Sequence, residues 1–210
     1  SVSEKEDVLK ECRKKNVPVV QVDRQIDDED TNAVLWEDFR LAYTLAEHVI
    51  DKGHTNVAIE NTRLGCSTGQ HRLQGYLEAF RSQGIRIDEE NISASNFEMQ
   101  DAYEHVKSLL EKPKCPTCII CSNNIMVKGS LKAIQEKGLS IPEDISICCF
   151  GNIETNEYSL TDITNIQQDT RLMGRKAGEL LLSQINEENH CSVKIKLSGK
   201  MIERSSVRQI

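Results

Sequence analysis

Short apolar runs alternate with helix-like segments along almost the whole chain. These runs lie at 17–22, 57–59, 117–121 and 145–150. Their length and continuous apolar character are typical of strands buried on both faces, as in parallel sheets. Several helix-like segments end at a glycine, which adopts the left-handed conformation that closes a helix, at Gly53, Gly84 and Gly138. The alternation predicts a doubly wound α/β protein.

The same patterns predict the order of the elements. Helices are expected at 3–15, 34–52, 68–83, 99–112, 124–137 and 169–187. Strands are expected at 17–22, 55–60, 91–95, 117–121 and 144–150, with two more near 192–197 and 200–204. The stretch 154–168 carries no clear pattern, and we interpret it as a segment that crosses between two lobes.

Composition limits the functions open to the chain. Its 210 residues carry a formal net charge of −7, and the acidic groups are spread along the whole length, so the surface does not attract phosphate backbones. No apolar run approaches the roughly 18 residues of a membrane span, and the polar start lacks a signal-peptide core. We expect a soluble, cytoplasmic protein with no membrane partner, which does not itself bind nucleic acid.

Eight cysteines raise the question of disulfide, metal or redox chemistry. The sharpest spacing is Cys115-x-x-Cys118-x-x-Cys121, which suits half a zinc site or a redox pair. A structural zinc site usually needs a second pair at comparable spacing, whereas Cys148 and Cys149 are adjacent and would point to opposite faces of a strand. We favour buried strand cysteines that act as small hydrophobes, with no metal and no cofactor.

Polar and aromatic side chains follow the predicted strands, at the edge of a parallel sheet where ligands bind. They are Ser67, Thr68, Arg72, Phe97, Ser122, Asn123, Asn124 and Asn152. An arginine, amides, hydroxyls and an aromatic face suit a sugar, nucleobase or small acid, because they offer directed hydrogen bonds and a stacking surface. The chain is therefore expected to hold a small polar molecule.

Each of these residues also has a purely structural interpretation. Asn123 would serve equally as the cap of the helix after it, and Ser67 and Thr68 as caps of the helix that contains Arg72. Arg72 would serve as a solvated helix residue, and Phe97 as a core residue under its loop. The cluster as a whole, more than any single member, indicates a binding site.

One enzyme motif is present, because residues 65–69 fit the G-x-S-x-G pattern of a nucleophile elbow around Ser67. An elbow turns directly from strand to helix, whereas several residues separate Ser67 from its strand. The late histidine that a triad needs has one convincing candidate, His190. No phosphate-binding loop, dinucleotide-binding fingerprint or histidine–carboxylate metal motif is found. A serine hydrolase stays a remote alternative, and we expect no enzyme activity.

An ordered set of stretches resembles the effector-binding core of the LacI/GalR family of bacterial transcription regulators, and the likeness covers essentially all 210 residues. The stretches are Pro18 to Arg24, His48 to His54 with Val57 to Ile59, Arg72 to Tyr76, Pro116 to Asn123, Gly138 to Ser146, and Leu160 to Gln168 with Gly174 and Ala177. The resemblance implies a two-lobed α/β, periplasmic-binding-protein-like fold, with parallel sheets flanked by helices and an incomplete N-terminal lobe.

In that fold three chain crossings join the lobes, and here they are expected near Asp51, Gln168 and Ser192. The N-terminal lobe would hold 1–50 and 168–192, and the C-terminal lobe 51–167 and 193–210. The resemblance implies a homodimeric repressor domain whose allostery modulates operator DNA binding by a helix-turn-helix headpiece. That headpiece and the first strands are absent from the sequence, so we expect a truncated form of a longer chain. A transport-linked sugar-binding protein is the alternative.

The resemblance also implies site residues in the cleft between the lobes. Arg72 would anchor the effector and Phe97 would stack on it, and the remaining contacts would be Thr68, Asn123, Asp38, Gln168 and Thr170, beside Asn152. The family commonly has carboxylates where this chain has Asn124 and Gly151. The effector is expected to be a sugar, sugar phosphate, nucleobase or small acid, and the missing carboxylates favour a less hydroxylated or anionic one.

Overall fold

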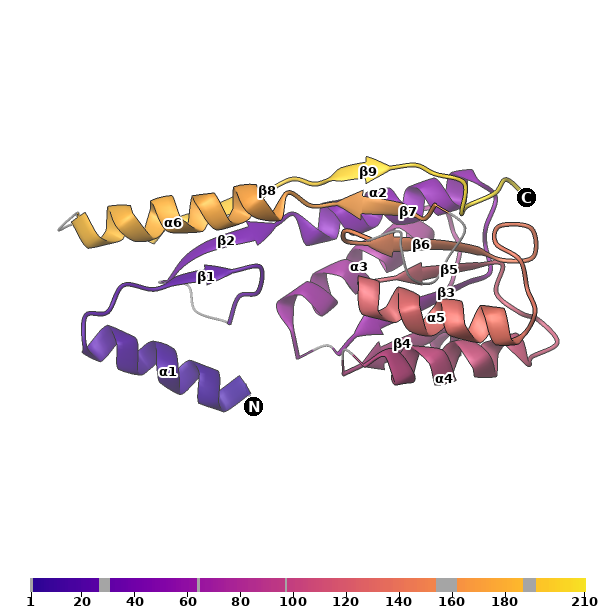
Figure 1. Ribbon diagram of the computed structural model, residues 1–210, viewed down its shortest axis with the longest axis horizontal. Coiled ribbons are helices and arrows are strands. Elements are labelled where there is room, and N and C mark those ends of the chain that lie inside the picture. The colour runs from indigo at the N-terminus through magenta and orange to yellow at the C-terminus, as the bar shows by residue number, and fades with distance from the viewer. Residues whose placement is uncertain (1, 27–30, 64, 97, 154–161, 187–191) are drawn as a thin grey trace.

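The computed structural model describes residues 2–26, 31–63, 65–96, 98–153, 162–186 and 192–210 (Figure 1). The helices are α1 (Val2–Lys14), α2 (Asp38–Asp51), α3 (Ser67–Ser82), α4 (Met99–Leu110), α5 (Asn124–Glu136) and α6 (Thr170–Asn186), with a short 3-10 turn at Glu89–Asn91. The strands are β1 (Val20–Val22), β2 (Asn32–Trp36), β3 (Val57–Thr62), β4 (Ile92–Ser95), β5 (Cys118–Cys121), β6 (Ser146–Phe150), β7 (Thr164–Gln167), β8 (Lys194–Leu197) and β9 (Lys200–Ile202).

The strands form two sheets. The smaller has the order β1-β2-β8 and is parallel throughout. The larger has the order β4-β3-β5-β6-β7-β9 and is parallel except for β9, which runs antiparallel to β7. Two mainly parallel sheets with helices on their faces confirm the predicted two-lobed α/β fold (Figure 1).

Helices cover both faces of the larger sheet, and this explains the unbroken apolar runs of its strands. One face packs on α2 and α3, where Leu45, Tyr76 and Phe80 are fully buried. The other packs on α4 and α5 around Val106 and Met126. On the smaller sheet, α6 packs against β1 and β2. Within the residues the structure describes, no helix is long and apolar enough to cross a membrane.

The cysteines of β5 and β6 lie in this core. Cys118, Cys121, Cys148 and Cys149 are fully buried, and burial raises the pKa of the Cys121, Cys148 and Cys149 thiols. Cys115, the first member of the spaced triplet, is exposed. Over the described ranges no group of three or more side chains is placed to hold a metal ion. The positions agree with cysteines acting as small hydrophobes.

Two element predictions are wrong. A helix was expected to begin at 34, but β2 occupies Asn32–Trp36 and the helix begins at Asp38. The apolar residues of β2 run directly into the helical pattern, so periodicity alone cannot separate them. The second error is β7, which lies in a stretch where no element was expected. Its residues Thr164–Gln167 are mostly polar, and they form a strand because β6 and β9 flank them on both sides.

The strand pairing also differs from the expected lobe division in two places. The helix α2 packs on α3 against the larger sheet, so the first crossing lies at Glu37 and not near Asp51. The strand β8 pairs with β2 in the smaller sheet, so the last crossing follows Leu197 instead of lying near Ser192. Between β7 and α6 the chain passes through Gln168 and Asp169.

A buried charged pair ties α4 to the larger sheet. His105 Nδ1 lies 2.6 Å from Glu60 Oε1, and His105 Nε2 lies 3.0 Å from the carbonyl oxygen of Glu90. Glu60 also accepts a 2.6 Å hydrogen bond from Ser93. Both ring nitrogens lie near acceptors, an arrangement that favours the doubly protonated ring. Burial lowers the pKa of His105, but the hydrogen bond and the charge of Glu60 outweigh it and raise this pKa above 6.5.

This pair predicts a pH-dependent stability. The folded-state pKa of His105 exceeds its unfolded value, so its contribution is complete below about pH 6.5 and is lost as the pH rises through the folded-state pKa. Urea unfolding over a pH series should show the difference between the wild type and His105→Gln shrinking toward alkaline pH. A difference that grew with pH would contradict the assignment.

Candidate functional site

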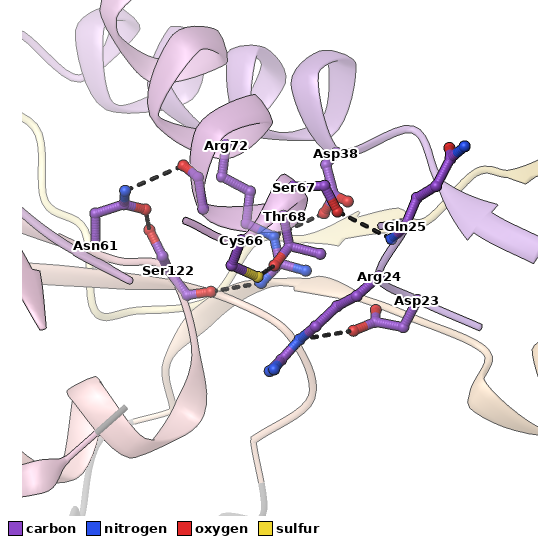
Figure 2. Close-up of polar contacts among 11 residues, drawn as sticks. Asp23, Arg24, Gln25, Asp38, Asn61, Cys66, Ser67, Thr68, Arg72 and Ser122 are labelled. Atoms are coloured by element: carbon purple, nitrogen blue, oxygen red, sulfur yellow. Dashed lines mark hydrogen bonds and ion pairs between the residues drawn. The ribbon is translucent and has the colours of Figure 1, made fainter. Parts of the chain in front are cut away.

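Arg72 lies at the centre of the polar groups at the carboxyl ends of the larger sheet's strands (Figure 2). It projects from α3, and only 8% of its surface is exposed. Its Nε donates to Asp38 Oδ1 at 2.7 Å, and its Nη1 donates to the carbonyl oxygen of Ser122 at 2.7 Å. The guanidinium carbon also lies 3.9 Å from the centre of the Phe150 ring. Arg72 is therefore a fixed, buried cation and not a solvated helix residue.

The partner of Arg72 is Asp38, the first residue of α2. Burial raises the pKa of the Asp38 carboxyl, and this effect outweighs the charge and the hydrogen bond of Arg72, which lower it. The 2.7 Å contact and the near-complete burial of both side chains mark a true ion pair, because neither charge has enough solvent to remain alone. The pair joins the start of α2 to α3 directly beside the crossing at Glu37.

A second layer holds Arg72 in place, and it includes a residue that the sequence did not suggest. Asn61, fully buried in β3, donates to the carbonyl oxygen of Gly69 at 3.1 Å and accepts from Ser122 Oγ at 2.8 Å. Asn61 thereby ties the first turn of α3 to the β5–α5 loop, from which Ser122 contacts Arg72 (Figure 2). An amide inside an otherwise buried strand was the signal available in the sequence.

The first turn of α3 is held differently from the expected cap. Cys66 occupies the N-cap position, so the expectation that Ser67 or Thr68 caps the helix is wrong. Ser67 Oγ instead accepts from the backbone N–H of Gln25, which lies in the loop after β1. Thr68 is buried and its hydroxyl lies 2.9 Å from Cys66 Sγ. Burial raises the pKa of Cys66, but hydrogen bonds from Thr68 and Gly69 lower it overall.

Asn123 caps α5, as its structural interpretation predicted. Its side-chain oxygen accepts from the backbone N–H of Met126 at 3.0 Å. That bond fixes the orientation of the amide, so its nitrogen is the free end. This nitrogen is buried and has no hydrogen-bond partner in the described part of the chain. Asn123 follows Ser122, so the free donor lies one residue from the carbonyl that binds Arg72.

The remaining predicted contacts lie at the ends of β6 and β7. Asn152 and Gln168 are joined by two 2.8 Å hydrogen bonds between the Asn152 side chain and the Gln168 backbone. Thr170, the first residue of α6, is exposed. Gly151 has a φ of +119°, which disfavours any side chain there. Phe97, the predicted stacking residue, lies outside the described residues.

A cavity of about 690 Å³ opens beside this cluster, between the smaller sheet and the beginnings of α2 and α3. It shares Asp38 and Ser67 with the Arg72 cluster. Its lining residues are Asp23, Gln25, Leu35, Trp36, Glu37, Asp38, Phe39, Arg40, Ser67, Gln70, His71, Lys194 and Lys196. The volume is within the usual range for a bound metabolite.

The geometry gives little support to hydrolase chemistry at Ser67. The hydroxyl accepts from a backbone N–H, and no hydrogen bond joins it to a histidine among the described residues. The late histidine of the motif, His190, lies outside them. Ser67 is also the first residue of α3, five positions beyond the end of β3, which is not the sharp turn of an elbow.

Comparison with known proteins gives consistent results. The profile of the family described as periplasmic binding protein-like domain matches residues 46–207. The chain is 31% identical to the HTH-type transcriptional repressor PurR of Pasteurella multocida, over 92% of this chain and 58% of that protein. It is 31% identical to the probable HTH-type transcriptional repressor ExuR of Bacillus subtilis, over 94% of this chain and 60% of that protein.

A solved structure shares the fold. A putative transcriptional regulator LacI from Bacillus cereus subsp. cytotoxis superposes with a TM-score of 0.89 at 21% identity, over 97% of this chain and 73% of that chain. The present chain spans about three fifths of the length of the two repressors it resembles.

Proposed function

Because this chain belongs to the family of periplasmic binding protein-like domains, in the form carried by LacI/GalR-type regulators, we propose that it is the effector-sensing and dimerising domain of a transcriptional repressor. A small polar effector binds in the cleft between the two sheets. Its binding shifts the domain between arrangements that differ in operator affinity, through the difference in effector affinity between them.

The observation that carries this proposal is the placement of Arg72. The guanidinium is buried at the ends of the strands, where open α/β sheets bind ligands. It is held by α2 through Asp38 and by the β5–α5 loop through Ser122. A ligand at this point would be sensed by both of these elements, directly beside the crossing at Glu37. Thr68, Asn123, Gln168, Thr170, Asn152 and Phe97 stay proposed contacts.

The whole protein would act as a cytoplasmic homodimer and not as an enzyme. The net charge of −7 argues against operator contact by this domain. We therefore assign that contact to a helix-turn-helix headpiece outside these 210 residues. The transport-linked sugar-binding protein remains the second candidate, since the fold serves both roles.

A ligand screen tests the proposal. Thermal unfolding is followed in the presence of sugars, sugar phosphates, nucleobases and small acids. A true effector at 100 times its Kd should stabilise the chain by about 2.7 kcal/mol. A structure of the complex should then place it against Arg72. A ligand that binds elsewhere would overturn the site, and one that leaves the operator affinity of the full-length protein unchanged would favour the transport role.

A further inference from the structure

The cavity beside Arg72 has an unusual charge balance for so acidic a chain. It is lined by three carboxylates, Asp23, Glu37 and Asp38. Each of them has an arginine partner, at 3.9 Å from Arg24 for Asp23, 3.8 Å from Arg40 for Glu37 and 2.7 Å from Arg72 for Asp38. The negative charge of the cavity wall is therefore already compensated by the protein.

Two cations in the same wall are not compensated. Lys194 and Lys196 line the cavity from β8, and in the part of the chain that the structure describes neither side chain has an ion pair or hydrogen bond. They are two residues apart on one strand, so both point to the same face, with their Cα atoms about 7 Å apart. Both residues are exposed. The lining alone holds three carboxylates and three cations, but Arg24 and Arg72 pair with two of the carboxylates from outside the lining. The charges of Lys194 and Lys196 are therefore left unmatched, in a chain whose net charge is −7.

Two acceptors of the wall are already occupied. Asp38 Oδ1 accepts from Arg72, and Ser67 Oγ accepts from the backbone of Gln25. A ligand that enters this space meets two ammonium groups that both donate hydrogen bonds and carry positive charge, a combination that favours anionic oxygens. Phe39, 43% exposed, adds an apolar wall that a bare inorganic ion would not use. The volume of about 690 Å³ suits a metabolite.

We propose that the effector is a small organic anion, with a carboxylate or phosphate group bound by Lys194 and Lys196 in the cavity between the sheets. This inference rests on the proposed sensing function and narrows it to one chemical class. The lysines act by charge, so the binding must weaken as salt screens them.

The experiment compares ligands that carry an anionic group with neutral counterparts of the same carbon skeleton. Isothermal titration of the 210-residue chain uses glucuronate and glucose 6-phosphate against glucose, and succinate against 1,4-butanediol, at low and high salt. Glucuronate and succinate test a carboxylate, and glucose 6-phosphate tests a phosphate, so the experiment shows which anionic group is bound. An anion is expected to bind at least tenfold more tightly than its neutral match, and the difference should fall at high salt.

Substitutions then test whether Lys194 and Lys196 supply the positive charge that binds the anion. The double variant Lys194→Gln/Lys196→Gln is expected to lose at least tenfold in affinity for the anion and to leave its thermal midpoint unchanged, because both side chains are exposed. Lys200→Gln is the control, because it removes one positive charge at an exposed residue of β9, away from the cavity lining, and should change affinity less than twofold. Equal losses in the double variant and the control would overturn the assignment.

The outcomes separate this inference from the sensing function. If a neutral member binds best, in contact with Arg72 and indifferent to the two lysines, the anion is excluded while the sensing function stands. If an anion binds and its affinity depends on the two lysines, the anionic effector and the sensing function are both supported. If no member of any pair binds, the result counts against both.

Discussion

Replacing Arg72 with alanine is expected to lower the free energy of unfolding by about 3–5 kcal/mol, the usual cost of leaving one partner of a buried ion pair alone. Asp38 would lose its 2.7 Å contact inside the protein. The carbonyl of Ser122 and the ring of Phe150 would lose their contacts with the guanidinium. Effector binding should weaken by about 2 kcal/mol, roughly thirtyfold, the scale for a charged hydrogen bond. Urea unfolding and titration with the screened ligand measure the two effects.

Asp38→Asn is the control that separates charge from packing. In the Arg72→Ala background it removes the stranded carboxylate and should recover part of the lost stability, whereas alone it should be destabilising. Arg72→Lys keeps the charge but not the forked donors, so it should keep more stability than alanine while still binding poorly. Additive effects of Arg72→Ala and Asp38→Asn would contradict a coupled pair.

Gly75→Ala is expected to destabilise the chain by about 1–3 kcal/mol, because a methyl group has no room where α3 crosses α2. A Cβ atom at Gly75 would lie 2.9 Å from the Ala42 Cβ and 3.0 Å from the Tyr43 backbone nitrogen, and closer still to the carbonyl oxygen of Phe39. Either α2 or α3 would have to move, and both carry residues of the site. Chemical unfolding measures the loss.

Gly174→Ala is the matched control for this prediction. Gly174 lies inside α6, and a Cβ there would meet nothing within 4 Å. The same substitution should therefore stabilise by about 0.5–1 kcal/mol, because alanine is the better helix former. A loss at both positions would mean that Gly75→Ala acts through helix propensity and not through the crossing of α2 and α3.

Much of the fold was predictable because its signals are local. The helix-ending glycines Gly53, Gly84 and Gly138 all adopt positive φ, and the alternation of apolar runs and helices is the α/β order observed. The errors arose where tertiary pairing decides the structure. The polar strand β7 exists because of its neighbours, and β8 joins the smaller sheet through a partner, β2, far away in sequence.

The site was predictable in part. Helix periodicity and the position after a strand pointed to Arg72, and the family resemblance supplied Asp38, but neither could show that the two form a buried pair. Asn61 was missed because its role depends on two loops that meet only in the folded chain. The charge balance of the cavity was equally hidden, since it requires knowing which arginine each carboxylate contacts.

The three crossings between the sheets lie close together. Glu37 donates its backbone N–H to the carbonyl oxygen of Leu197, and a Cβ at Gly199 would lie 2.8 Å from the carbonyl of Gln167 and 3.3 Å from Leu41. Figure 1 shows these links along one side of the molecule. When two bodies are joined along one edge, a rotation about that edge displaces atoms more the farther they lie from it. The Gln25–Ser67 hydrogen bond joins the loop after β1 to α3 away from these links, so breaking it would remove a contact that opposes rotation about that edge.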